Sequence, residues 1–228
     1  MTDKPIPKTE FDWAMYADAT FAGLAILIPL PPLDAAFEFY FRTRMPRAIA
    51  RRRGQTLTPE VVRIMNRAHG DGCLAGCLMA PLNGTVWLIK RLSRKILYFL
   101  TVKEASDKVS SYWHRAFLID YMLLEGHAAQ PETALIGRSA IEAVLGDITT
   151  SPLLQLANQV TRGVSHIWRT LRKARQGEED EVVQETRAQM EQNWSSFSAY
   201  FIELARQYDQ AYREIEQERL SRSLEVKA

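Results

Sequence analysis

The segment AGLAILIPLPPLDAAFEFYFRTRMPRAIARRR, residues 22–53, joins an apolar run, three prolines and a dense arginine cluster. Six arginines and no acid lie between Arg42 and Arg53. Proline restricts the residue before it to extended conformations, so we expect an apolar helix from Asp18 to Ile28 and then an extended stretch or tight turn over IPLPPL. A second helix should follow, with Asp34 as its cap, Pro46 as a candidate kink and Gly54 as its end.

Helix signals continue through the rest of the chain, and no alternating strand of useful length occurs. Thr58 and Pro59 are typical of a helix start, and we expect that helix to run to Gly70. Apolar spacing predicts further helices over 103–125, 133–146 and 153–171. The sequence therefore predicts an all-α helical bundle with two apolar helical hairpins, each interrupted by Pro or Gly, and a long C-terminal helix.

The acidic stretch RQGEEDE is the best candidate for a boundary, dividing a helical body (1–176) from a long amphipathic helix (177–228). Heptad spacing in the second part predicts a seam along another helix, in the body or in a partner. Trp194 and Phe201 are bulky for a two-stranded coil, which favours packing within the chain over dimerisation. The seam residues are Val183, Met190, Trp194, Phe197, Phe201, Leu204 and Tyr208.

Composition excludes several classes of protein. A formal net charge of +2 and the lack of base-reading motifs argue against nucleic-acid binding. Cys73 and Cys77 are the only cysteines, so a disulfide framework is excluded, and their spacing fits a packing seam better than a metal site. The N-terminus does not resemble a secretory signal, and we expect a reducing cytosol.

A second apolar run, GCLAGCLMAPLNGTVWLI (72–89), is uncharged for 18 residues but interrupted by Pro81, Asn83 and Gly84. Neither run is typical of a single membrane crossing, which needs about 20 apolar residues. Two interpretations stay open: bent hairpins entering one leaflet, or buried core helices whose arginines are a solvated end. In the first, the membrane contacts are Leu24, Leu27, Leu30, Leu33, Leu78, Leu82 and Trp87, and the headgroup ligands are Arg42, Arg44, Arg47, Arg51, Arg52, Arg53, Lys90 and Arg91.

The motif IPLPPLD, Ile28 to Asp34, resembles the Ile-Pro-x-Pro-x-x-Asp hairpin of the EcsC-like and YcjF-like families, helical membrane-associated bacterial proteins. The similarity covers about the first hundred residues and includes the arginine-rich continuation and the second interrupted apolar run. It implies association with the inner face of a bacterial membrane and no particular chemistry.

Catalytic motifs are missing from the sequence: there is no phosphate-binding Gly-rich loop, no Gly-x-Ser-x-Gly elbow and no His-Glu-x-x-His. Asp107, Ser110 and His114 share a helix face, but their order does not suit a triad, and a solvated polar face is the better interpretation. We expect no enzyme activity, cofactor or metal. The leading hypothesis is a peripheral or monotopic membrane protein of the cytoplasmic face, and the alternative is a soluble helical adaptor or self-associating scaffold.

Overall fold

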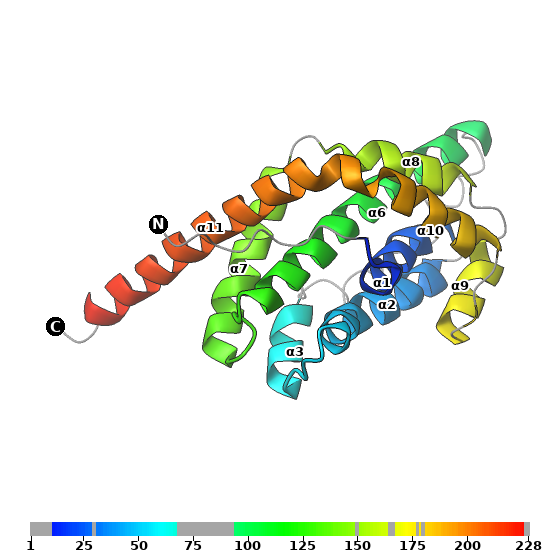
Figure 1. Cartoon of the computed structure of the whole chain (residues 1–228). Helices are drawn as coiled ribbons and strands as arrows, with labels where there is room; N and C mark the ends of the chain where they lie inside the picture. Colours follow the sequence, from blue (N-terminus) through cyan, green and yellow to red (C-terminus); the bar gives the residue numbers. More distant parts are fainter. Residues whose placement is uncertain are drawn as a thin grey trace, which may run out of the picture.

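The computed structural model describes residues 11–28, 31–67, 94–148, 151–163, 167–176, 178 and 181–225. Within these ranges every regular element is helical, and the helices pack into a bundle with a long C-terminal helix (Figure 1). The predicted all-α class is therefore confirmed. The prediction for the second apolar run (72–89) lies outside the described residues.

The first apolar run forms helix α1 (Trp13–Leu24) and the short turn η1 (Ala25–Leu27). Asp12 caps α1 by accepting a hydrogen bond from the Ala14 amide at 3.0 Å. The helix packs against α2 and against α6 (Arg94–Leu124), and a Cβ atom on Gly23 would lie 2.5 Å from the Cα of Val109. Glycine thus allows α1 and α6 to approach closely, and most of the first apolar run is core.

Helix α2 spans Pro31–Arg52, so it begins earlier than predicted: Asp34 lies in its first turn and does not precede it. Proline is tolerated in a first turn because the amide hydrogen it lacks would have no partner there. Pro46 lies inside the helix and is buried, and Gly54 follows the end with a φ of 68°. The predicted end at Gly54 is confirmed.

Helix α3 (Pro59–Asn66) begins as predicted, with the Thr58 hydroxyl accepting from the Val61 amide at 3.3 Å. It ends at Asn66, four residues before the predicted stop at Gly70. Its apolar face, which includes Val61 and Ile64, packs on α2 and on α7 (Pro131–Asp147).

The central helix α6 is longer than predicted because it begins at Arg94 rather than near Lys103. It carries the largest fully buried side chain among the described residues, Trp113, whose indole Nε1 donates to the Thr20 hydroxyl of α1 at 2.8 Å. After α7, the region predicted as one helix over 153–171 contains two helices, α8 (Leu153–Gly163) and α9 (Ile167–Gln176). α8 packs along α6, and α9 contacts α1 and η1.

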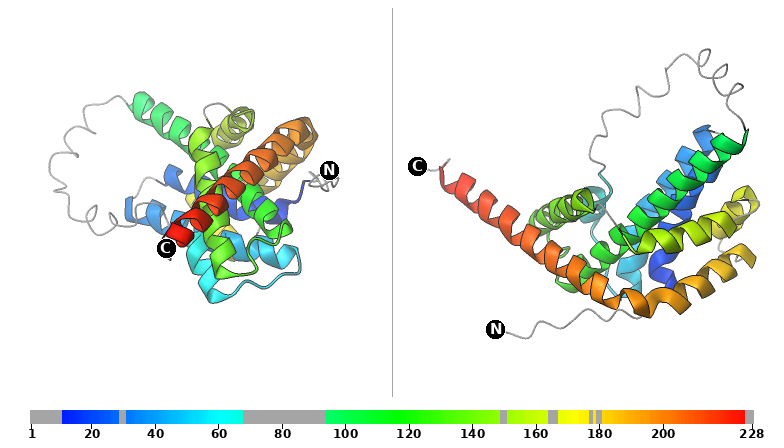
Figure 2. Two further views of the ribbon diagram at one scale, coloured as in Figure 1. Left: turned by 90° about the vertical axis from the view of Figure 1, so that its left-hand side faces the viewer. Right: turned by 90° about the horizontal axis from the view of Figure 1, so that it is seen from above.

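The C-terminal helix consists of α10 (Glu181–Trp194), one 3₁₀ turn η2 (Ser195–Phe197) and α11 (Ser198–Glu225). Its seam packs on this chain's own helices: α10 on α8, and α11 on α7 and α6. Of the predicted seam residues only Phe197 is not fully buried, and all of them belong to or contact the same core as the body. Beyond these contacts α11 continues away from the bundle as a projecting arm (Figure 2).

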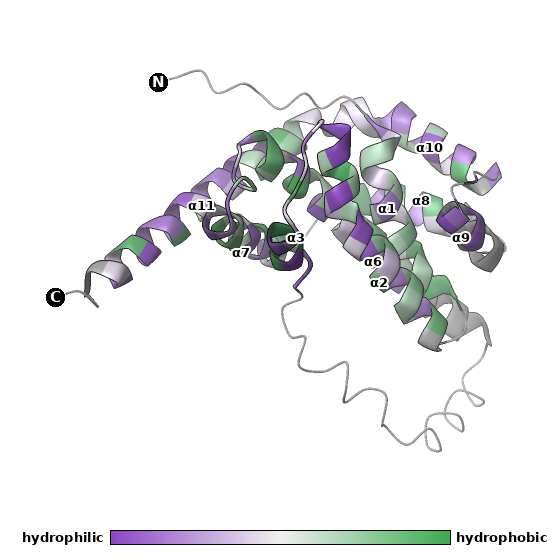
Figure 3. Ribbon diagram, turned by 90° about the horizontal axis from the view of Figure 1, so that it is seen from below, coloured by the Kyte–Doolittle hydropathy of each residue, from purple (hydrophilic) through white to green (hydrophobic). Residues whose placement is uncertain are grey.

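Among the described residues, no helix combines the length and the apolar character that a membrane crossing requires. In Figure 3, hydrophilic residues predominate on α9 and on the projecting part of α11, so these two helices lack the apolar character.

Candidate functional site

The structure divides the predicted membrane contacts into three groups. Leu24 is only 1% exposed and lies in the core, so its prediction as a membrane contact is wrong: protein side chains, not acyl chains, cover it. Leu27 and Leu33 are partly buried and pack at the edge of the core. Leu30, Leu78, Leu82 and Trp87 lie outside the described residues.

Two of the predicted headgroup arginines are engaged by buried carboxylates of the protein itself. Arg44 Nε donates to both oxygens of Asp18 at 2.9 and 3.0 Å, and Arg53 pairs with Asp120. Burial raises the pKa of Asp18, and the hydrogen bonds from Arg44 oppose that rise. Removal of either arginine would leave a buried carboxylate without its partner, so both arginines have a structural role, and the structure gives no support to the prediction that Arg44 and Arg53 bind headgroups.

The other predicted cations have different surroundings. Arg52 pairs with Asp12 but keeps more than half of its side chain exposed, and Arg47 and Arg51 are exposed. Arg42 is half-buried and lines a polar cavity described below. Lys90 and Arg91 lie outside the described residues.

An apolar groove of about 610 Å³ separates α2 from α9. Phe39 and Tyr40 are 55% and 37% exposed there, although both are large and apolar. Arg172 and Arg175 of α9 line the opposite side, and the guanidinium of Arg175 lies 5.9 Å from the centre of the Phe37 ring. The described residues that line the groove include no carboxylate.

The residues predicted from the sequence do not include Arg172 and Arg175, because the helix expected over 153–171 ends before them. The signal was present: two arginines three residues apart lie on one face of a helix. What the sequence could not supply was the neighbouring helix, since α2 precedes α9 by more than a hundred residues.

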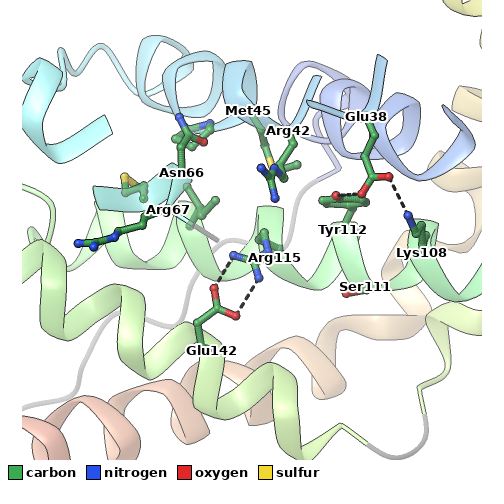
Figure 4. Close-up of a pocket in the computed structure, with 13 residues that line it drawn as sticks. Glu38, Arg42, Met45, Asn66, Arg67, Lys108, Ser111, Tyr112, Arg115 and Glu142 are labelled. Atoms are coloured by element: carbon green, nitrogen blue, oxygen red, sulfur yellow. Dashed lines mark hydrogen bonds and ion pairs between the residues drawn. The ribbon is translucent and has the colours of Figure 1, made fainter. Parts of the chain in front are cut away.

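A polar cavity of about 320 Å³ lies between α2, α3, α6 and α7 (Figure 4). Glu38 accepts from Lys108 and from the Tyr112 hydroxyl, both at 2.7 Å. Burial, and then the neighbouring Glu38 carboxylate, raise the pKa of Tyr112, so its hydroxyl stays protonated. Arg42 points from α2 toward this cavity.

His114 lies in the core with three polar partners, and the prediction of a solvated polar face is wrong for it and for Ser110. Its Nδ1 lies 2.5 Å from the Ser110 carbonyl oxygen, and its Nε2 lies 2.7 Å from the Tyr200 hydroxyl and 3.0 Å from the Ser151 hydroxyl. Burial lowers the pKa of His114 to about 4, and the histidine therefore stays neutral at pH 7. Asp107, in contrast, is exposed as predicted.

The Ser151–His114 pair has the separation of a nucleophile and its base, but each residue has another role. Ser151 Oγ accepts from the Leu153 amide at 3.0 Å and so caps α8, and His114 joins α6 to α8 and α11. A histidine with such a low pKa is a weak general base at neutral pH. We interpret the cluster as a polar link in the core.

No group of three or more His, Cys, Asp or Glu side chains in the described part of the chain is arranged to hold a metal ion. No family model, curated protein or solved structure matches the chain. The resemblance to the EcsC-like and YcjF-like families therefore stays a prediction.

Proposed function

We propose that this protein is a non-catalytic peripheral membrane protein that binds anionic lipid at the cytoplasmic face of the cell membrane. One observation carries the proposal: the groove between α2 and α9 pairs exposed aromatic rings with arginines and contains no acid among its described lining residues. An anionic bilayer is complementary to this surface, because it provides acyl chains for the aromatic rings and negative headgroups for the arginines.

The residues of the groove suit the two layers of a bilayer surface. Tyr40 and Phe39 can enter the interfacial region, where aromatic rings are enriched. Arg172 and Arg175 can reach phosphate groups, each contributing roughly 1 kcal/mol near an anionic surface. The groove also presents Leu33, which retains partial exposure at the start of α2.

The directions of α2 and α6 are consistent with a single end of the bundle that faces the membrane. Glu38 meets Lys108 and Arg53 meets Asp120, so α2 and α6 run parallel and begin at the same end of the bundle, as Figure 2 shows in the view from above. The second apolar run precedes α6 in the sequence. In this proposal that end of the bundle, which includes Leu33 at the start of α2, faces the membrane.

Flotation of the full chain with lipid vesicles tests the proposal. We expect flotation with vesicles of phosphatidylcholine and phosphatidylglycerol, and much less with phosphatidylcholine alone. Added salt should weaken binding without abolishing it, because screening affects the arginines and not the aromatic rings. Replacing Arg172 and Arg175 together by Gln should reduce partitioning by about 30-fold, which corresponds to about 2 kcal/mol.

A matched control uses two exposed arginines of the projecting arm, Arg213 and Arg219, replaced together by Gln. This variant has the same net charge as the groove variant and should float like the wild type. Equal loss in both variants would show a general charge effect, and failure of the wild type to float at low salt would refute the proposal.

A second candidate function, a self-associating scaffold, is favoured by the arm of α11. Leu220 is 60% exposed there, and both signs of charge alternate around it. Sedimentation equilibrium of the full chain tests this candidate. A monomer at all concentrations would exclude it, whereas a dimer that dissociates on Leu220→Glu would support it.

A further inference from the structure

The cavity between α2, α3, α6 and α7 has an unbalanced charge. Its described lining contains four cations, Arg42, Arg67, Lys108 and Arg115, and two carboxylates, Glu38 and Glu142. With the cations protonated and the carboxylates ionised, two positive charges remain after all possible pairing.

Both carboxylates already have partners on both oxygens. One oxygen of Glu38 accepts from Lys108 and the other from the Tyr112 hydroxyl. Glu142 forms a two-pronged pair with Arg115, with N–O distances of 2.9 and 3.0 Å. The excess charge therefore resides on the other two arginines (Figure 4).

Arg42 and Arg67 have no carboxylate partner among the described residues. The Nε of Arg42 is buried and lacks a hydrogen-bond acceptor within the described structure. A buried donor without an acceptor is costly, and the cost is higher for a charged group. Arg67 follows the last turn of α3 and contributes to the lining from another element, and its exposed guanidinium extends outward from the cavity in Figure 4.

We propose that this cavity binds a phosphate dianion, either free or as the end group of a phosphate monoester. A dianion cancels the two excess charges, and guanidinium groups match phosphate oxygens in two-pronged geometry. The volume of about 320 Å³ lies at the small end of ligand pockets. Met45, Met65 and Ile119 form an apolar part of the lining that suits a short organic group.

Titration calorimetry of the full chain at constant ionic strength tests the site, with inorganic phosphate, glycerol 3-phosphate and glycerol as probes. Both phosphates should bind and glycerol should not. Arg42→Gln and Arg67→Gln should each weaken phosphate binding about tenfold or more, the loss expected for a hydrogen bond between charged groups. The control Arg47→Gln changes an exposed arginine of the same helix and should leave binding unchanged.

A variant that is expected to strengthen phosphate binding distinguishes an effect on binding from an effect on folding. Glu142→Gln releases Arg115 and increases the excess positive charge, so it should tighten phosphate binding several-fold. Arg67 is exposed, so Arg67→Gln should fold even if Arg42→Gln does not. Absence of binding by the wild type, or equal binding by Arg67→Gln and Arg47→Gln, would overturn the proposal.

The source of the phosphate is decided by competition. Vesicles containing phosphatidic acid present the same monoester in a lipid headgroup, whereas phosphatidylglycerol presents a diester. Displacement of glycerol 3-phosphate by phosphatidic acid vesicles would assign the site to a lipid, and lack of displacement would assign it to a soluble phosphate. Either result supports the shared chemistry, and both are independent of flotation through the groove between α2 and α9.

Discussion

Acid should destabilise this protein through His114, and the substitution His114→Gln should remove much of the effect. The imidazole is 1% exposed and lies among the Ser110 carbonyl, the Ser151 hydroxyl and the Tyr200 hydroxyl. None of these partners is an anion, so nothing in the cluster compensates the desolvation of an imidazolium. A glutamine side chain in place of the imidazole would retain one acceptor and one donor but could not titrate.

The magnitude follows from the two pKa values of His114, 6.5 when unfolded and about 4 in the structure. Since the folded pKa is the lower one, the unfolded chain binds more protons between these values, and stability falls as the pH falls. The contribution is fully present above pH 6.5 and is lost as the pH approaches 4. At pH 5 the loss is about 2 kcal/mol, from 1.36 kcal/mol per pH unit.

Urea unfolding at pH 7, 6 and 5 measures the effect for the wild type and for His114→Gln. The difference in unfolding free energy between the two proteins should change by about 2 kcal/mol over this range, in favour of the variant at low pH. His127→Gln is the matched control, because it removes a histidine and leaves the cluster intact. Parallel pH curves for the wild type and His114→Gln would refute the reasoning.

Three further substitutions test the packing. Gly23→Ala should lower the free energy of unfolding by about 1–3 kcal/mol, as measured by urea unfolding, because its Cβ would overlap the backbone of Val109. Thr58→Ala should cost about 1 kcal/mol in the same assay through loss of the α3 cap. Asp120→Ala should lower the melting temperature more than Thr58→Ala does, since it leaves the Arg53 guanidinium without its carboxylate.

Local signals explain what the sequence predicted correctly. Thr58 and Pro59 determine a helix start through the side chain and backbone of two adjacent residues, so no tertiary information is needed. The heptad spacing from Val183 to Tyr208 likewise identified the buried face of the C-terminal helix. The bulk of Trp194 and Phe201 favoured packing within the chain, which is what the structure shows.

The burial of Leu24 could not be predicted in the same way. Hydropathy reports a preference for leaving water, and this preference is similar for a protein core and for acyl chains. The distinguishing feature is the partner surface on α6, including Val109, which lies more than eighty residues away in the sequence. A short apolar run therefore predicts that its side chains are buried, but it does not predict whether a protein core or a lipid bilayer covers them.

The partners of the arginine cluster likewise could not be predicted from the sequence. Between Arg42 and Arg53 the sequence contains no acid, which suggested a uniform cationic surface. In the fold, acids from distant segments enter that run: Asp18 reaches Arg44 from α1, and Asp120 reaches Arg53 from α6. A run of arginines shows that negative partners are needed. Only the tertiary structure shows which of the arginines pair with carboxylates of the same chain.

Helix α2 unites these observations because its faces have different neighbours. Phe41 faces α1 and is completely buried, Phe39 and Tyr40 face the groove beside α9, and Glu38 and Arg42 face the cavity beside α6. A helix turns about 100° per residue, so neighbours in sequence reach different environments. The two proposed ligands, an anionic membrane and a phosphate dianion, thus use adjoining faces of one helix, where the Arg42 guanidinium lies 5.8 Å from the centre of the Phe39 ring. The mixture of aromatic and cationic residues in α2 is therefore explained by several faces with different neighbours, and not by a single amphipathic surface.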